Sequence, residues 1–166
     1  KCWFDSKKCK QGLDALLKGA DAAGAYRPEV EKGFLAFLEW EKSHGVKWRK
    51  SEMTVHHPLL CFAGTLDAIC EFEGKSYVVD FKSSNGFYDT FGMQIAAYRA
   101  AAGAMGEAVE GCGILRLDKK TGEPEWRDYS RRQQRDYNAF CKLLDFWYAA
   151  AKRKLKNNPR VAEGEI

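Results

Sequence analysis

The sequence predicts an α/β fold in which a helix, three strands, a second helix and a fourth strand follow one another in the order αβββαβ. Apolar residues recur at intervals of three and four in several segments, as expected for helices with one buried face. Between them lie shorter segments rich in β-branched and aromatic residues and bounded by glycine-containing turns, which is typical of strands. The 166 residues, 45% of them apolar, are enough for one core, so we expect a single domain spanning 1–166.

Each element follows from a local signal. Pro28 is well placed to begin a helix, because its missing N–H costs nothing in the first helical turn. An apolar stripe from Tyr137 to Tyr148 marks a long C-terminal helix. In chain order, we expect an N-terminal helical extension over 5–18, a helix from Pro28 to about Gly45, strands at about 47–56, 60–73 and 76–82, a helix over 90–102, a strand over 111–117, a hairpin turn at 118–122 leading into 125–129, and a helix over 131–156.

The second and third strands form a tight hairpin that predicts a shared face. We expect Gly74 and Lys75 to form the turn, because glycine accepts the positive φ that such turns require. This register places Asp67 opposite Lys82, and it places Asp80 opposite Ile69. Because side chains alternate between the two faces of a sheet, Asp67, Asp80 and Lys82 then emerge on the same face.

Two carboxylates and a lysine on one face indicate a metal-dependent hydrolytic site. Mg²⁺ is typically held by one or two carboxylates together with water and substrate phosphate, and Asp67 and Asp80 fit that description. We therefore expect Mg²⁺ or Mn²⁺ as the cofactor. Such a cation polarises a phosphate and lowers the pKa of a bound water. Lys82 would orient or deprotonate that water and offset the charge that develops on phosphorus.

Gln94 and Tyr98 complete a pattern of three motifs. They lie one turn apart on the helix over 90–102 and project from one face. Together with Gly64-Thr65-Leu66-Asp67 and Asp80-Phe81-Lys82, they follow the order GxxD, DxK, QxxxY. This order resembles the PD-(D/E)XK nuclease superfamily, and within it the RecB-type exonuclease branch, over residues 46–130. The resemblance implies a restriction-endonuclease-like core with a mixed central sheet flanked by helices.

The resemblance also implies roles for individual residues. Asp67 and Asp80 would be metal ligands, the backbone carbonyl of Phe81 a further ligand, and Lys82 the catalytic lysine. Gln94 and Tyr98 would brace the catalytic site or contact the substrate backbone. Relatives of this type usually carry an additional acidic or histidine ligand upstream. Glu52 is the best candidate here, although a solvent-facing strand residue is an equally good interpretation.

Charge and aromatic patterns indicate a DNA partner. The net charge is +4, and Lys152, Arg153 and Lys154 belong to a basic run at the end of the last helix. Such a run attracts phosphates in a salt-dependent way, although it also complements the helix dipole. Ser83 and Tyr88 follow the DxK motif, and we expect them to contact DNA together with Gln94 and Tyr98. Tyr88 could stack on unpaired bases, or it could belong to the core.

The cysteines argue against a second metal centre. The chain has six of them, and no two are spaced as C-x-x-C. Some RecB-type nucleases bind an iron–sulfur cluster through one early cysteine and a closely spaced late group, and the late group is missing. We therefore expect no iron–sulfur cluster and no zinc site. No apolar run approaches the roughly 18 residues of a membrane span, and no signal peptide is visible, so we expect no membrane association and a cytoplasmic location.

The resulting hypothesis is a metal-dependent deoxyribonuclease that hydrolyses phosphodiester bonds in single- or double-stranded DNA. The resemblance favours an exonuclease of phage or bacterial recombination or repair. The alternative is a nucleic-acid-binding module that keeps the fold without turnover, since fold does not guarantee activity. A sequence-specific restriction endonuclease fits less well, because the sequence contains no separate recognition domain. The sequence leaves the oligomeric state open.

Overall fold

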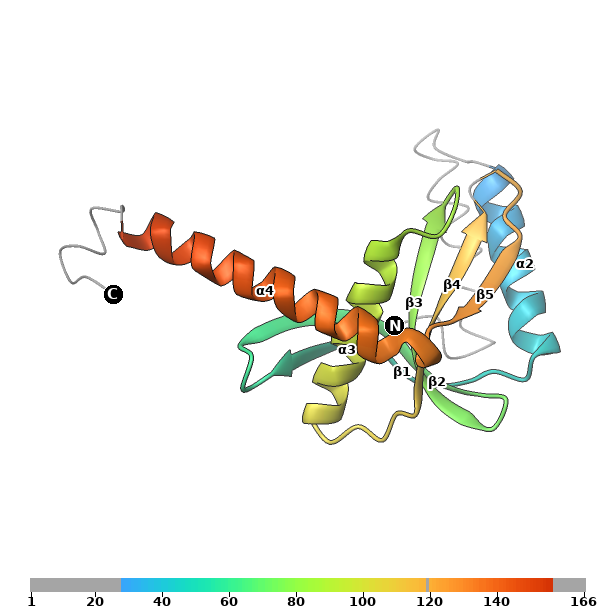
Figure 1. The fold of residues 1–166 in the computed structure, drawn as a ribbon. Coiled ribbons are helices and arrows are strands. Elements are labelled where there is room, and N and C mark those ends of the chain that lie inside the picture. The colour runs from blue at the N-terminus through green and yellow to red at the C-terminus, as the bar shows by residue number, and fades with distance from the viewer. Residues whose placement is uncertain (1–27, 119, 157–166) are drawn as a thin grey trace, which may run out of the picture.

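The computed structural model describes residues 28–118 and 120–156, with the side chains of 28–31 and 152–156 excluded. Figure 1 shows a central sheet with helices on both sides. The elements are α2 (Pro28–Ser43), β1 (Lys47–His57), β2 (Phe62–Phe72), β3 (Lys75–Ser84), α3 (Asp89–Ala104), β4 (Gly111–Asp118), β5 (Pro124–Asp128), a 3₁₀ turn (Ser130–Arg132) and α4 (Gln133–Lys156).

Within the described residues, five strands form one mixed sheet in the order β1-β2-β3-β4-β5. Strands β3 and β4 are parallel, and every other neighbouring pair is antiparallel. The parallel pair is joined by α3, because parallel neighbours need a crossover connection. The predicted αβββαβ order and mixed sheet are confirmed, and the arrangement is consistent with a restriction-endonuclease-like core. The hairpin predicted at 118–122 connects β4 to β5.

Two apolar clusters fill the space on the two faces of the sheet. On the α3 side, Ile95, Ala101 and Ala102 of the helix pack with Val78 of β3 and Ile114 of β4. On the α2 side, the cluster is largely aromatic and includes Phe37, Trp40, Phe72, Tyr77 and, at its edge, Trp126. The sheet is therefore covered on both faces, and α3 is anchored firmly enough to hold side chains in place above β3.

The hairpin between β2 and β3 turns one residue earlier than predicted, which shifts the pairing of the two strands by two residues. Glu73 and Gly74 form the turn, with φ of 49° and 75°, and Phe72 pairs with Lys75. Two consecutive positive φ angles are typical of the type I′ turn that favours glycine at its second position. The predicted turn at Gly74 and Lys75, and the pairings deduced from it, are wrong. A shift of two residues leaves every side chain on the same face, because the strand period is two.

The long helix α4 leaves the body of the protein. It crosses α3 near its own N-terminus and then runs out beyond the sheet (Figure 1). The 3₁₀ turn at Ser130–Arg132 precedes it, so the helix predicted over 131–156 begins as α-helix at Gln133. The predicted helix over 5–18 lies outside the described residues. Among the helices that are described, none combines the length and the apolar character needed to cross a membrane.

Candidate active site

Asp80 is a buried carboxylate at the centre of the sheet. Its side chain lies on β3, and the residue is only 3% exposed. Lys82 Nζ lies 2.6 Å from Asp80 Oδ2. Oδ2 has no well-aligned hydrogen-bond donor in the part of the chain that the structure describes, so the lysine is its ionic partner there. A buried carboxylate with one cationic neighbour is an unfavourable arrangement unless further positive charge is available.

The acidity of Asp80 reflects this burial. Desolvation raises the pKa of the Asp80 carboxyl from its ordinary value of 3.8 to about 6. The nearby Lys82 opposes this rise, while the charge of Asp67 and a hydrogen bond to it raise the pKa further. The two carboxyl groups are therefore close enough to compete for one proton. A divalent cation placed between them would relieve the same repulsion that a proton does.

Asp67 lies where β2 separates from β3. The backbone ladder between these strands ends at Ala68 and Val79, and Asp67 Oδ2 instead accepts the N–H of Phe81 at 2.7 Å. Leu66 and Ile69, three residues apart, both pack on the α3 side of the sheet, so the strict alternation of β2 is broken between them. The Asp67 carboxylate thus accepts a backbone N–H of β3 at a point where β2 no longer pairs with β3 through its own backbone.

A chain of polar contacts connects Asp80 to α3. Lys82 Nζ donates a hydrogen bond to Gln94 Oε1 at 2.9 Å, and Gln94 Nε2 donates to the Tyr98 hydroxyl at 3.1 Å. The Lys82 ammonium also lies 5.3 Å from the centre of the Phe91 ring, within cation–π distance. The predicted helical pair is therefore brought to the predicted lysine. These contacts fix the lysine above the carboxylates, and the ammonium has three N–H groups, so one can face a substrate or a water.

The contact with Tyr98 explains why the GxxD motif has a glycine at position 64. A Cβ atom at Gly64 would lie 2.7 Å from Cε1 of the Tyr98 ring, which is closer than carbon atoms tolerate. Gly64 therefore leaves room for the Tyr98 ring against β2, where its hydroxyl accepts the hydrogen bond from Gln94. The first and third motifs are in direct contact through this pair.

The remaining residues expected at the site occupy its edge. Glu52 is exposed and has a left-handed backbone with φ of 47°. It lies between the pairs Ser51–Ala68 and Met53–Leu66, at the position facing Asp67, where the ladder skips one pair. No three His, Cys, Asp or Glu side chains lie close enough to hold a metal ion together within the described part of the chain. Among the described residues, further ligands of a cation at Asp67 and Asp80 would therefore be backbone carbonyls, with water or phosphate beside them.

The expected DNA contacts are placed less completely. Ser83 is exposed near the end of β3, and Tyr88 is 55% exposed at the start of α3, with its ring 5.3 Å from that of Phe91. The backbone of Lys152–Lys154 belongs to α4, but these three side chains lie outside the described residues. Their predicted role in binding DNA stays a prediction.

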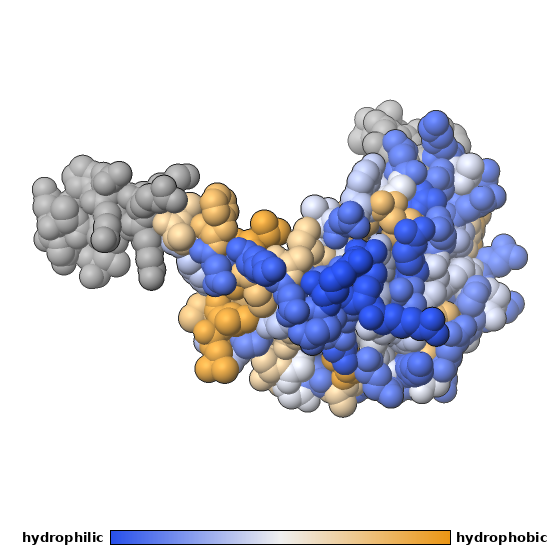
Figure 2. All heavy atoms as spheres, viewed as in Figure 1, coloured by the Kyte–Doolittle hydropathy of each residue, from blue (hydrophilic) through white to orange (hydrophobic). Residues whose placement is uncertain are grey.

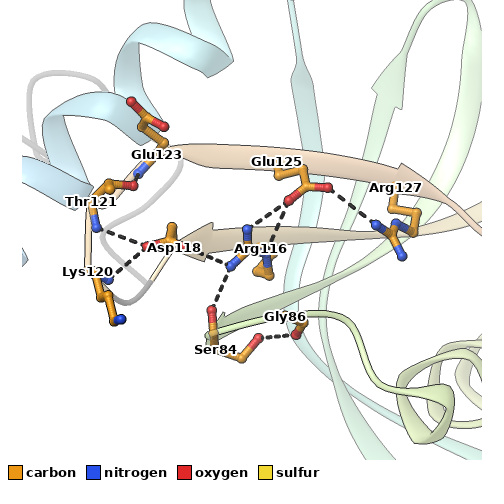
Figure 3. A network of polar contacts seen from close by, with 9 residues as sticks. All are labelled: Ser84, Gly86, Arg116, Asp118, Lys120, Thr121, Glu123, Glu125 and Arg127. Carbon is orange, nitrogen blue, oxygen red and sulfur yellow. Dashed lines mark hydrogen bonds and ion pairs between the residues drawn. The ribbon is translucent and has the colours of Figure 1, made fainter.

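An arginine that sequence reasoning missed holds the loop after the DxK motif. Arg116 is the β4 partner of Lys82, and it is only 9% exposed. Its guanidinium donates to the Ser84 carbonyl at 2.8 Å and forms ion pairs with Asp118 and Glu125 at 2.9 and 2.8 Å (Figure 3). Backbone N–H groups, chiefly that of Thr121, and Arg116 hold the pKa of Asp118 well below its usual range. The signal in the sequence was an arginine within the otherwise apolar stretch Gly111–Leu117.

Comparisons with known proteins agree with a nuclease. No family model matches the sequence. The chain is 29% identical over 126 residues to mitochondrial genome maintenance exonuclease 1 of Xenopus tropicalis. The aligned region covers 71% of this chain and 36% of that protein. The chain thus spans about a third of the length of this relative. A sequence similarity of this extent supports a nuclease-like family, and the matching protein is named as an exonuclease.

The crystal structure of SSO0001 was also compared with this chain. The matched region covers 78% of this chain and 68% of the SSO0001 chain, with 15% sequence identity and a TM-score of 0.36. A TM-score this low does not indicate a shared fold.

Proposed function

We propose that this chain is a metal-dependent nuclease domain that hydrolyses phosphodiester bonds in DNA, acting as an exonuclease. The observation that carries the proposal is the buried carboxylate Asp80, whose charge is only partly offset, with Asp67 beside it and Lys82 at 2.6 Å. The sequence similarity to a protein named as an exonuclease supports the same reaction class. Mg²⁺ or Mn²⁺ is the proposed cofactor.

The donor set fits such a cation. Asp67 and Asp80 would hold it through carboxylate oxygens, which are the ligands that Mg²⁺ and Mn²⁺ prefer, and the Phe81 carbonyl lies on the strand between Asp80 and Lys82. When bound, the cation supplies Lewis-acid polarisation of the phosphate and a more acidic water. Asp67 has a second task, because its Oδ2 holds the Phe81 N–H and so fixes the backbone between the ligand and the lysine.

Lys82 would act on the attacking water and on the charge that develops at phosphorus. Its Nζ is held between Asp80 and Gln94, so its position is set before substrate arrives. Such preorganisation is what makes an electrostatic contribution large, because no reorganisation is needed during the reaction. In the cleavage step Gln94 and Tyr98 are positioning residues, since they act through the lysine.

Cleavage of labelled DNA tests the proposal directly. Single- and double-stranded oligonucleotides, labelled at either end, are incubated with Mg²⁺, with Mn²⁺ or with EDTA. We expect cation-dependent release of products from an end, and a Lys82→Ala rate that is lower by about 10²- to 10⁴-fold, the range for loss of an acid–base group. Lys75→Ala is the matched control, because Lys75 is an exposed lysine at the far end of the same strand.

Three measurements separate the possible outcomes. Titration calorimetry with Mn²⁺ should show binding to the wild type and much weaker binding to Asp80→Asn, independently of any cleavage. Single-turnover rates at saturating enzyme separate a loss of chemistry in Lys82→Ala from a loss of DNA binding. DNA binding without cleavage under any cation condition would instead support the alternative of a binding module.

A further inference from the structure

An apolar groove of about 590 Å³ lies beside the candidate active site. Its walls come from α3, from α4 and from the chain just before and at the start of β2. The volume lies within the range of roughly 300–1,000 Å³ typical of ligand sites. The aromatic side chains of the lining are Phe62, Tyr98, Phe140, Trp147 and Tyr148.

Contacts between its walls fix the shape of the groove. The Tyr148 hydroxyl lies within hydrogen-bonding distance of the carbonyl oxygens of Leu60 and Cys61, at 3.0 and 2.6 Å, and so ties α4 to the connection between β1 and β2. The rings of Phe62 and Phe140 meet edge to face with their centres 4.9 Å apart. A ligand would therefore find a preformed surface, which lowers the entropic cost of binding.

One wall presents an exposed aromatic ring. Trp147 is 60% exposed, with its ring 5.2 Å from that of Tyr148. Figure 2 shows hydrophobic side chains gathered along the protruding part of α4 and near the hairpin of β1 and β2. The exposed ring extends the apolar surface of the groove, and contiguous exposed apolar surface is typical of interaction sites.

We propose that this groove binds unpaired nucleobases of the DNA strand whose phosphate lies at Asp67 and Asp80. The inference rests on the proposed nuclease function. Its basis is continuity, because Gln94 and Tyr98 line the groove and also form the contact chain to Lys82. A strand held at the carboxylates can thus continue directly into the groove.

The chemistry of the walls selects bases over the other parts of DNA. None of the described residues that line the groove is charged, so these residues offer no cation for a phosphate. Aromatic rings stack on the flat faces of bases, and the Gln94 amide and tyrosine hydroxyls can hydrogen-bond to base edges. A duplex presents its charged backbones outward and keeps its bases stacked inside, so it does not fill an apolar groove. The occupant is therefore a single strand.

Binding measurements on two variants of α4 test this site. Trp147→Ala removes the exposed aromatic ring at the mouth of the groove. Phe146→Ala is the matched control, because Phe146 is 69% exposed on the same helix but is not among the residues that line the groove. Fluorescence anisotropy is measured in EDTA, so that no cleavage occurs, with an oligo(dT) strand, a duplex of the same length and a strand containing a run of abasic sites. Stacking on one base corresponds to roughly a fivefold to hundredfold effect on affinity.

We expect Trp147→Ala to weaken binding of oligo(dT) by about tenfold or more, with Phe146→Ala within twofold of the wild type. The effect of Trp147→Ala should disappear with the abasic strand, because the bases are the proposed ligand. Equal binding by the two variants, or an effect of Trp147→Ala that persists with abasic DNA, would overturn the proposal. So would a dimer, detected by sedimentation, that Trp147→Ala alone dissociates, since the groove would then be covered by a second copy of the chain.

These outcomes are independent of the cleavage tests. If Trp147→Ala loses oligo(dT) binding and the wild type cleaves no DNA, the proposal for the groove is kept and the proposed nuclease function is refuted. Normal cleavage with no difference between the two α4 variants would retain the nuclease and refute the groove.

Discussion

Asp80→Asn should stabilise the metal-free protein at neutral pH. In the folded chain the pKa of Asp80 is about 6, compared with 3.8 for an ordinary aspartate, and burial is the main cause. A difference of about 2 in pKa corresponds to about 3 kcal/mol, at 1.36 kcal/mol for each pKa unit. The free energy of unfolding of the wild type is lower by this amount when Asp80 is buried in its ionised form. Asparagine carries no charge, so the Asp80→Asn variant does not have this loss of stability.

The pH dependence of this difference has a definite sign. Because the folded pKa is above the unfolded one, the folded protein binds the proton more tightly, and stability falls as the pH rises from about 4 to about 6. Near pH 4 the protonated aspartate resembles asparagine, so the two proteins should be similar. The advantage of Asp80→Asn should grow through this window and reach as much as about 3 kcal/mol at pH 7 and above.

Denaturant unfolding in EDTA between pH 4 and pH 8 measures this advantage. Asp145→Asn is the control, since Asp145 is an exposed aspartate on α4 whose replacement should change stability little at any pH. Parallel curves for the wild type and Asp80→Asn across this range would refute the reasoning, and so would a variant that is less stable than the wild type at pH 7.

Added Mn²⁺ should reverse the order of stability. A ligand that binds only the folded state stabilises it by about 4.1 kcal/mol at a concentration one thousand times its dissociation constant, which exceeds the advantage of about 3 kcal/mol expected for Asp80→Asn. The wild type should gain this stabilisation through Asp67 and Asp80, while Asp80→Asn should gain little. An equal gain in both proteins would place the cation elsewhere.

Two further substitutions test contacts around the site. Gly92→Ala should destabilise the protein by about 1–3 kcal/mol in thermal unfolding, because a Cβ there would overlap the buried Asp136 carboxylate. Gly103→Ala on the same helix should be neutral or stabilise by up to about 1 kcal/mol, since a Cβ there meets nothing within 4 Å. Arg116→Met should lower the cleavage rate by about ten- to a hundredfold, because the Ser84 carbonyl is then no longer held. Arg116→Lys should restore part of the rate. Unchanged rates in both variants would show that Arg116 has no role at the site.

The sequence predicted the elements of the fold because its local signals agreed with one another. Glycine-bounded strands and an apolar helical stripe placed all five strands and three of the helices to within a few residues. The shared face of Asp80 and Lys82 also survived an error in the turn. A two-residue shift preserves strand faces, so the conclusion depended on the parity of the register and not on its absolute value.

The contacts that organise the site could not be predicted in the same way. The hydrogen bond from the Phe81 N–H to Asp67 exists because the ladder between β2 and β3 ends one residue earlier, and no periodic pattern encodes where a ladder ends. Arg116 joins the loop at Ser84 from a strand more than 30 positions away. The groove depends on α4 returning across α3, which is a tertiary arrangement that helix propensity does not specify.

The candidate site therefore depends on small residues as much as on ionisable ones. Lys82 is held by Gln94, and Gln94 is held by Tyr98. Tyr98 reaches this position only because Gly64 presents no side chain to its ring. Gly64 belongs to the same short motif as Asp67, at the point where β2 leaves β3. Gly64 thus affects the position of Lys82 through Tyr98 and Gln94 of α3, and Asp67 affects it through the backbone of Phe81. The GxxD motif therefore positions the lysine as well as supplying a proposed metal ligand.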